Sequence, residues 1–130
     1  MQALLIICAF SSLLMLASCD GSVITNPQDI TFPDSNVSFR GQVLPFLALS
    51  CGVGGCHGDI SPAAGIRLTS YSTLLFDRPN LVVPGKPDES LIVQVLEGDL
   101  LHPWGNLRTT VSSSQIRGMR KWIEEGAIDN

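Results

Sequence analysis

The chain has 130 residues, of which 45% are hydrophobic and 15% charged, with a formal net charge of −4 at pH 7. This length accommodates one small domain and a tether. A mildly acidic chain without a cluster of Lys and Arg is not expected to bind nucleic acid. Aromatic residues are only 6% of the chain, so side chains alone would build a thin core that a bound group could complete.

The N-terminal segment of residues 1–18 has no charged side chain and ends in Leu16-Ala17-Ser18-Cys19. Its apolar run is typical of a secretory signal, since a spanning helix needs about 20 consecutive apolar residues. The Leu-Ala-Ser-Cys ending resembles the lipobox of bacterial lipoproteins, whose cysteine is diacylated and becomes the new N-terminus. The resemblance predicts removal of residues 1–18 and a lipid on Cys19. The protein would then lie in the cell envelope, anchored to a bacterial membrane and facing the periplasm or the cell exterior. An ordinary cleaved signal and a retained anchor are the alternatives.

The segment of residues 19–38 is predicted to be a lipidated N-terminus and a flexible linker, because prolines and short polar residues interrupt any periodicity there. We place the folded domain at residues 39–130. It opens with Phe39, Val43, Phe46 and Leu47 at helical spacing, which predicts a helix that Pro45 starts or kinks.

The most informative motif follows that helix, with Cys51 and Cys56 separated by four residues and His57 directly after. In the common haem-attachment motif two residues separate the cysteines. The thiols add to the haem vinyl groups, and the histidine becomes an axial ligand of the iron. Three of the four residues in this gap are glycines, whose backbone freedom could absorb the longer loop. We therefore interpret Cys51 and Cys56 as the covalent attachment sites of one haem c.

Three other interpretations of the motif compete with haem attachment. A disulfide between Cys51 and Cys56 suits an exported protein but does not explain the adjacent histidine. A zinc site of Cys51, Cys56, His57 and His102 would need adjacent Cys-His ligands, which fit poorly with the usual spaced pairs. A thiol redox motif normally has two intervening residues.

Two further helices are predicted downstream of the motif. The first spans about residues 89–96 with Asp88 as its N-cap and an apolar face of Leu91, Ile92, Val95 and Leu96. The second begins with a capping box of Ser112 and Gln115 and ends at Gly126. Its apolar stripe consists of Ile116, Met119, Trp122 and Ile123. A glycine inside this helix, Gly118, predicts close approach by another helix, for which the one before Cys51 is the candidate.

The order of these segments resembles the planctomycete-type cytochrome c domain. The resemblance rests on Val43-Leu44-Pro45 and the cysteine motif, then the Gly65-Ile66-Arg67-Leu68 strip. It continues through a segment of residues 84–91 that reads Pro-Gly-Lys-Pro-Asp-Glu-Ser-Leu, and closes at residues 122–127 with Trp-Ile-Glu-Glu-Gly-Ala. It implies an all-α, cytochrome c-like domain of three to five helices, with long loops around one covalent haem.

The resemblance also suggests the second axial ligand. Related domains usually carry Met-Pro before the final helix, where this chain has His102-Pro103. We therefore expect His57 and His102 to ligate the iron from opposite faces, with Met119 as the rival for the second position. Trp104 could pack on the porphyrin edge or lie at the surface. Arg67 and Lys86 could pair with the haem propionates or remain solvated.

The implied function is one-electron transfer between exported redox proteins at a membrane surface, without enzymatic activity. Two strong ligands would leave no open position for oxygen or peroxide, which favours a carrier over a haem enzyme. One alternative is a non-redox lipoprotein adaptor with a Cys51–Cys56 disulfide. Another is a haem-based sensor in which a gas displaces His102.

Overall fold

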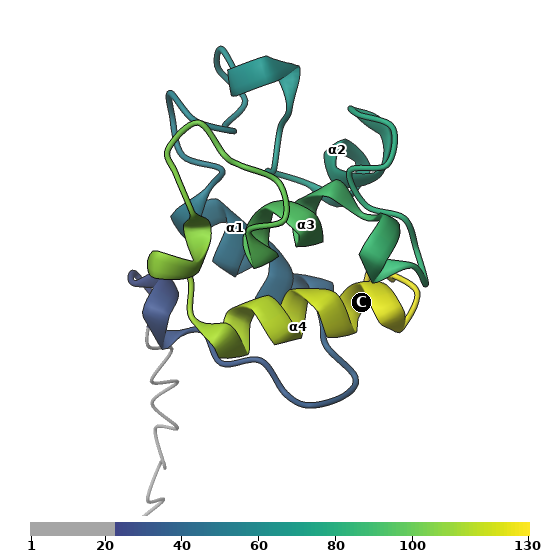
Figure 1. Ribbon diagram of the computed structural model, residues 1–130. Coiled ribbons are helices and arrows are strands. Elements are labelled where there is room, and N and C mark those ends of the chain that lie inside the picture. Colours follow the sequence, from purple (N-terminus) through teal and green to yellow (C-terminus); the bar gives the residue numbers. More distant parts are fainter. Residues whose placement is uncertain (1–22) are drawn as a thin grey trace, which may run out of the picture.

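Four α-helices carry the fold of residues 23–130, the part of the chain that the computed structural model describes (Figure 1). They are α1 (Leu44–Ser50), α2 (Tyr71–Phe76), α3 (Leu91–Glu97) and α4 (Ser113–Glu124). Shorter helical turns join them: η1 (Pro27–Asp29), η2 (Phe39–Val43), η3 (Ala63–Gly65), η4 (Pro87–Glu89) and η5 (Leu107–Thr109). Residues 23–130 contain no β-strand, which confirms the predicted all-α class and is consistent with a cytochrome c-like fold.

The predicted signal peptide of residues 1–18 and the predicted lipidation site Cys19 lie outside the described residues. Among residues 23–130, no helix combines the length and the apolar character that crossing a membrane requires.

Helix α4 confirms the predicted capping box and apolar stripe. The Ser112 hydroxyl accepts a hydrogen bond from the Gln115 N–H at 3.2 Å, and the Gln115 side chain accepts one from the Ser112 N–H at 3.1 Å. The predicted stripe faces the core, because Met119, Trp122 and Ile123 are fully buried and Ile116 nearly so. Gly126 follows the helix with φ +101°, the left-handed conformation in which glycine commonly ends a helix.

Phe39 packs against two other aromatic side chains of the core, Tyr71 and Trp122. The ring of Phe39 lies 5.6 Å from that of Trp122 and 5.4 Å from that of Tyr71, as measured between centroids. Two polar groups of this cluster donate hydrogen bonds to backbone carbonyls that follow α4 and so hold that segment against the core. The Tyr71 hydroxyl donates to the Ala127 carbonyl at 2.9 Å, and the Trp122 indole N–H donates to the Ile128 carbonyl at 3.0 Å.

Helix α3 begins two residues later than predicted, and Asp88 is not its N-cap. Residues Pro87–Glu89 form the separate turn η4, and Ser90 occupies the N-cap position. The Ser90 hydroxyl is fully buried, where it accepts from the Val83 N–H at 2.9 Å and donates to the Lys86 carbonyl at 3.0 Å. Asp88 instead forms an ion pair with Arg120 of α4, which also contacts Glu97 and so ties both ends of the η4–α3 unit to α4.

Packing extends further toward the N-terminus than the predicted domain boundary at residue 39. Ile30 and Val37 are buried, 4% and 1% exposed. The N–H groups of Asn36 and Val37 donate to the Glu125 carboxylate at 2.8 and 2.9 Å. Residues 27–38, expected to be a flexible linker, therefore pack against α4 and the residues that follow it.

The close approach predicted at Gly118 is made by this segment and not by the helix before Cys51. A Cβ atom at Gly118 would lie only 2.1 Å from the ring of Phe32. The Phe32 ring also packs edge-on against Phe46 of α1, with 5.8 Å between centroids. Phe32 thus lies between α1 and α4, where the sequence predicted that the two helices contact each other directly.

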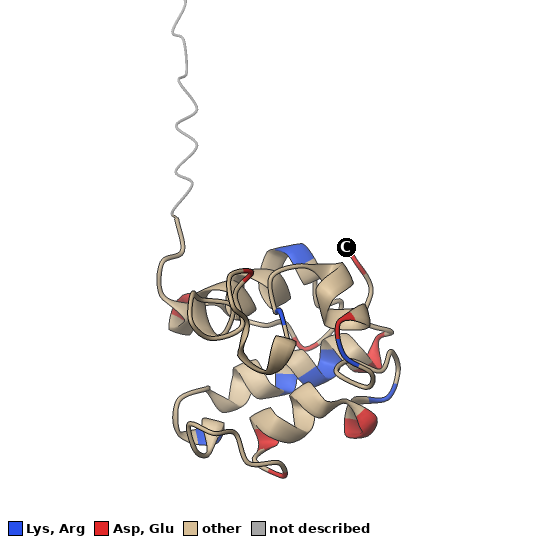
Figure 2. Ribbon diagram, turned by 90° about the horizontal axis from the view of Figure 1, so that it is seen from above, with Lys and Arg blue, Asp and Glu red and all other residues tan. Residues whose placement is uncertain are grey.

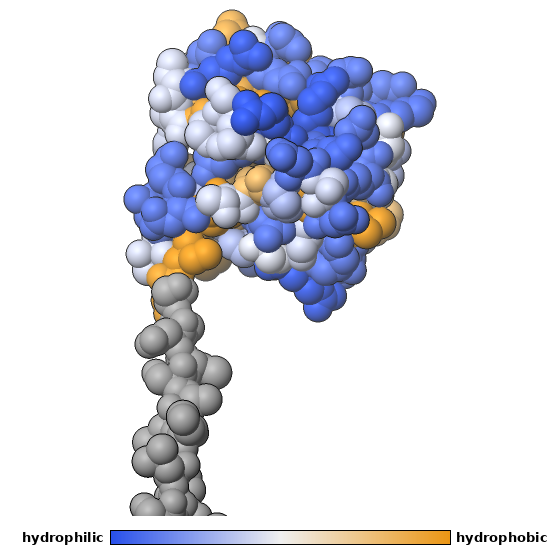
Figure 3. All heavy atoms as spheres, turned by 90° about the horizontal axis from the view of Figure 1, so that it is seen from below, coloured by the Kyte–Doolittle hydropathy of each residue, from blue (hydrophilic) through white to orange (hydrophobic). Residues whose placement is uncertain are grey.

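Basic and acidic positions are interspersed over several elements (Figure 2), and ion pairs join many of them within residues 23–130. The face seen from below is mainly hydrophilic, with a hydrophobic patch beside the start of the described chain (Figure 3). Val23 and Ile24, the first two described residues, are exposed there, at 83% and 43%.

Candidate functional site

The two motif cysteines lie in a loop that follows α1, and backbone hydrogen bonds close this loop. The Cys51 N–H continues the helix by donating to the Leu47 carbonyl at 2.8 Å. The loop then returns on itself, since the His57 N–H donates to the Cys51 carbonyl at 3.0 Å. Gly55 takes φ +82°, so the glycine-rich gap supplies a left-handed conformation that lets four residues separate the cysteines. His57 therefore lies directly beside the first cysteine.

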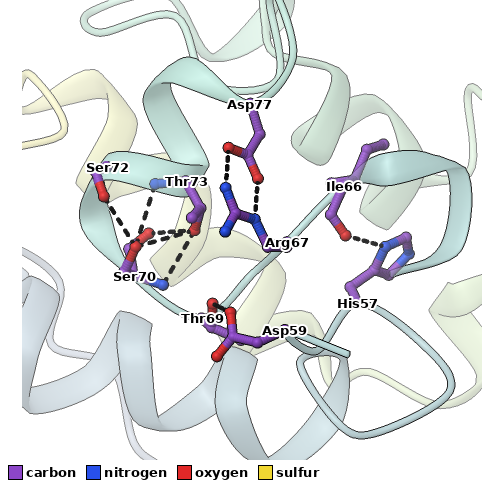
Figure 4. A network of polar contacts seen from close by, with 9 residues as sticks. All are labelled: His57, Asp59, Ile66, Arg67, Thr69, Ser70, Ser72, Thr73 and Asp77. Carbon is purple, nitrogen blue, oxygen red and sulfur yellow. Dashed lines mark hydrogen bonds and ion pairs between the residues drawn. The ribbon is translucent and has the colours of Figure 1, made fainter. Parts of the chain in front are cut away.

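The imidazole of His57 is oriented by a backbone carbonyl. Its Nδ1 lies 3.1 Å from the carbonyl oxygen of Ile66, as Figure 4 shows. A carbonyl only accepts, so Nδ1 carries the proton and Nε2 presents its lone pair. This is the tautomer in which a histidine binds a metal through Nε2, with the second nitrogen held by an outer partner. The orientation of His57 therefore leaves Nε2 available to a metal, and its predicted role as an iron ligand stays a prediction.

The segment that supplies the Ile66 carbonyl is held by a two-pronged ion pair. Arg67 donates through Nε and Nη2 to the Asp77 carboxylate at 2.8 and 2.9 Å (Figure 4). The hydrogen bonds from Arg67 hold the pKa of Asp77 below its ordinary value. Leu68 adds a second tie, because its N–H donates to the His57 carbonyl at 2.9 Å. Arg67 consequently holds the segment beside His57 in place, and its guanidinium is occupied by Asp77.

His102 lies opposite His57 on a tight turn. The His102 carbonyl accepts from the Gly105 N–H at 2.8 Å, which closes the turn over Pro103 and Trp104. Inside the turn, the Trp104 N–H donates to Nδ1 of His102 at 3.2 Å. Nδ1 is therefore an acceptor and the proton resides on Nε2. His102 differs from His57 in this respect, because ligation through Nε2 would require this hydrogen bond to break.

The spacing of the two imidazoles fits a shared iron. Their ring centroids are 6.0 Å apart, with 69° between the ring planes. Histidine nitrogens bind first-row metals at about 2 Å, so two imidazoles on opposite sides of one ion have centroids about 6 Å apart. The structure thus brings His57 and His102 together at the separation that bis-histidine ligation needs.

Two cavities flank this histidine pair, with volumes of about 470 and 390 Å³. Both are lined by Cys51, His57, Ala63, His102, Trp104 and Leu107, so they meet at the imidazoles. We call them together the crevice. Leu91 and Val95 of α3 line the larger cavity, and Cys56 lines the smaller one. Apolar walls with few polar groups are typical of cofactor sites, and a planar macrocycle could extend through both cavities.

The rival ligand Met119 lies elsewhere. Its side chain is fully buried in the core and lines neither cavity. Lys86 is also outside the crevice and pairs with Glu89 at 3.0 Å. Trp104 lines both cavities while remaining 78% exposed, so it stands at the crevice edge.

The alternatives to haem find little support in the same geometry. Within residues 23–130, no group of three or more His, Cys, Asp and Glu side chains is arranged to hold a metal ion. Burial raises the pKa of the Cys51 thiol, an effect that the Ser50 hydroxyl opposes. Reactive redox cysteines instead have lowered pKa values. Cys51 and Cys56 are both partly exposed free thiols, directed toward the smaller cavity.

Two groups at the crevice have no signal in the sequence. The Ile66 carbonyl is a backbone group, and no side-chain pattern identifies which carbonyl will face a histidine. Arg78 lines the larger cavity, yet it is a single arginine between Asp77 and Pro79 with no motif around it. Only the fold reveals either position.

Comparison with known proteins agrees with this geometry. Residues 54–100 match the family described as Planctomycete cytochrome C. The resemblance expected from the sequence is therefore confirmed over this part of the chain, which holds Cys56 and His57. Cys51 precedes the matched range by three residues and His102 follows it by two. Neither the curated proteins nor the solved structures gave a match.

Proposed function

We propose, from the Planctomycete cytochrome C segment at residues 54–100, that the protein is a one-electron carrier with one covalent haem c. Cys51 and Cys56 would hold the haem through thioether bonds, and His57 and His102 would ligate its iron. The haem supplies a reversible one-electron couple. The protein supplies the attachment, the axial ligands and an apolar environment.

One observation carries this proposal: the arrangement of the two imidazoles across the crevice. Their centroids are 6.0 Å apart, and the Ile66 carbonyl leaves Nε2 of His57 free to bind a metal. A disulfide adaptor has no need of a second histidine at this position. A zinc site would need further ligands, which the described residues do not bring to the pair.

The proposed ligand set favours a carrier over a haem enzyme. Ligation by two histidines occupies both axial positions, and it gives a lower reduction potential than histidine with methionine. We further propose that a lipid on Cys19 holds the protein in the cell envelope, at the periplasmic or exterior face of a bacterial membrane. Its partners would be other exported redox proteins that exchange electrons at that surface.

A visible spectrum tests the central claim. The full chain is expressed in a host with cytochrome c maturation, and a reduced-minus-oxidised spectrum and a pyridine haemochrome assay are recorded. We expect sharp α and β bands on reduction, and haem that stays with the polypeptide after denaturation.

The matched control is the double variant Cys51→Ser, Cys56→Ser, made under the same conditions. It should retain no haem after denaturation, because both thioether bonds are removed. If the unaltered protein is colourless although maturation is intact, the carrier proposal fails and the disulfide adaptor becomes the better account.

A haem-based sensor is the second candidate, and one contact favours it. The Trp104 N–H occupies Nδ1 of His102, which favours the tautomer that cannot ligate through Nε2. A ligand held against this preference would be displaced more readily than His57. Carbon monoxide added to the reduced protein separates the candidates: a carrier keeps its spectrum, whereas a sensor forms the carbon monoxide adduct.

A further inference from the structure

We infer that Arg78 binds a propionate of the haem, at the end of the crevice opposite Cys56. This inference rests on the proposed function, since it requires a haem in the crevice. Pairing with a propionate is the role that the sequence suggests for Arg67 and Lys86, and it falls here to Arg78.

The crevice has an order of chemical groups along its length. Cys56 lines only the smaller cavity, and Cys51 lines both. His57 and His102 stand where the cavities meet, and Arg78 lines only the larger cavity. The crevice thus presents the Cys56 thiol at one end, the Cys51 thiol and the two imidazoles where the cavities meet, and the Arg78 guanidinium at the other end.

The haem has the same order of groups. Its vinyl groups, which become the thioethers, lie toward one side of the porphyrin, the iron lies at the centre, and both propionates lie at the opposite side. With the vinyl carbons at the cysteines and the iron between the imidazoles, the propionates point into the larger cavity. Arg78 is the cation at that end.

The larger cavity offers little else to a carboxylate. Apart from Arg78, Cys51 and the two histidines, its lining consists of aliphatic residues, Pro103 and Trp104. A carboxylate left without a partner beside such walls would be unfavourable. A guanidinium presents paired N–H donors that match a carboxylate.

The other candidate cations are already engaged. Arg67 makes its two contacts with Asp77, and Lys86 pairs with Glu89. Arg78 takes part in none of the ion pairs formed within residues 23–130, and its side chain is exposed at the edge of the cavity. It can therefore turn toward a propionate without giving up an existing partner.

The reduction potential measures this contact directly. Arg78→Gln removes a positive charge near the iron and leaves a propionate uncompensated, and both changes favour the ferric form. At the midpoint potential of the unaltered protein, we expect the ratio of reduced to oxidised haem to fall at least threefold, which is about 28 mV for a one-electron couple. The propionate bending band in the resonance Raman spectrum should shift as well.

Two variants serve as controls in the full chain. Arg78→Lys keeps the charge and should change the ratio less than twofold. Arg108→Gln removes an exposed arginine that lines neither cavity, and it should leave the potential and the Raman band unchanged.

The outcomes distinguish this inference from the proposed function. If all variants carry haem and Arg78→Gln keeps the potential and Raman band of the unaltered protein, Arg78 does not bind a propionate and the carrier remains. If Arg78→Gln alone fails to hold haem, the charge is needed for attachment, which supports the inference. If both Arg78 variants lose haem while Arg108→Gln keeps it, the charge is not the relevant property and the inference is overturned. If even the unaltered protein attaches no haem, both proposals fall.

Discussion

His57 and His102 face each other across the crevice but have opposite hydrogen-bonding environments. Nδ1 of His57 donates to a carbonyl, whereas Nδ1 of His102 accepts from an amide. The first contact supports ligation through Nε2 and the second opposes it. In the proposed haem-bound protein, His102 should therefore be the weaker of the two iron ligands.

Replacing His102 tests whether it ligates the iron in the haem-bound protein. His102→Met should keep the haem attached, because the thioethers and His57 are unchanged. The reduction potential should rise, since a thioether ligand favours the ferrous state more than an imidazole does. Spectroelectrochemical titration measures the change, and loss of the bis-histidine absorption spectrum confirms the ligand exchange.

Met119 provides the matched control for this experiment. Because Met119 is fully buried and lines neither cavity, Met119→Leu should leave the potential and spectrum unchanged. Its effect on stability should be below about 1.5 kcal/mol, as for other volume-conserving core exchanges. If instead Met119→Leu moves the potential and His102→Met does not, the ligand assignment must be reversed.

Single residues differ in how far the sequence could predict their roles. The position of His57 beside Cys51 and Cys56 follows from the motif, in which a histidine directly follows the second cysteine. His102 was found through the family resemblance, since a lone histidine has no signature of its own. The Ile66 carbonyl and Arg78 could not be found in either way, because the folded chain alone brings them to the crevice.

At the scale of elements, local signals proved more reliable than long-range ones. The capping box of Ser112 and Gln115 and the stripe of α4 follow from contacts three and four residues apart, so the sequence contains them directly. The start of α3 was misplaced because Asp88 and Ser90 both suit an N-cap. In the structure the Ser90 hydroxyl is buried at the N-cap and Asp88 pairs with Arg120. Both features depend on residues that are distant in the sequence.

Gly118 shows the same limit of local patterns. A glycine in a helix interior indicates a close neighbour but not its identity. Here the neighbour is Phe32, from a segment whose prolines and polar residues resemble a linker. Isolated apolar residues such as Ile30, Phe32 and Val37 have no periodicity, so their packing against the domain has no signal in the sequence.

Substitution of Gly118 measures how firmly this segment is packed. Gly118→Ala improves helix propensity by about 1 kcal/mol, but the new methyl group would overlap the Phe32 ring. Overpacking of this kind usually destabilises by about 1–3 kcal/mol, so we expect a net loss of stability. The urea midpoint, followed by the fluorescence of the buried Trp122, should fall.

A double-mutant cycle separates the steric effect from other effects of the alanine. In the background Phe32→Ala the ring is absent, and Gly118→Ala should then stabilise through its helix propensity alone. If Gly118→Ala is equally destabilising in both backgrounds, the contact with Phe32 is not the cause and the assigned packing is wrong.

At the scale of the whole molecule, the packed N-terminal segment would shorten the tether between the domain and the proposed lipid on Cys19. Turn η1 is fixed to the domain, because the Gln115 side-chain amide donates to the Pro27 carbonyl and that of Gln28 donates to the Thr110 carbonyl. Eight residue-to-residue steps lead from Cys19 to Pro27, which span at most about 28 Å at about 3.5 Å per step. Pro27 and Gln28 also line the smaller cavity, so a lipid on Cys19 would keep the cysteine end of the crevice near the membrane.

The lipid anchor is tested by removing the acylated residue. Cys19→Ser should leave the protein either unprocessed or released into the soluble fraction, because acyl chains are what hold such a protein on a membrane. Fractionation, intact mass and incorporation of labelled fatty acid measure the outcome.

Cys8→Ser is the matched control within the apolar run, and this variant should be processed and acylated as before. If Cys19→Ser is still acylated and membrane-bound, Cys19 is not the anchor. Haem attachment should be the same in both variants, because the thiols that line the crevice are those of Cys51 and Cys56.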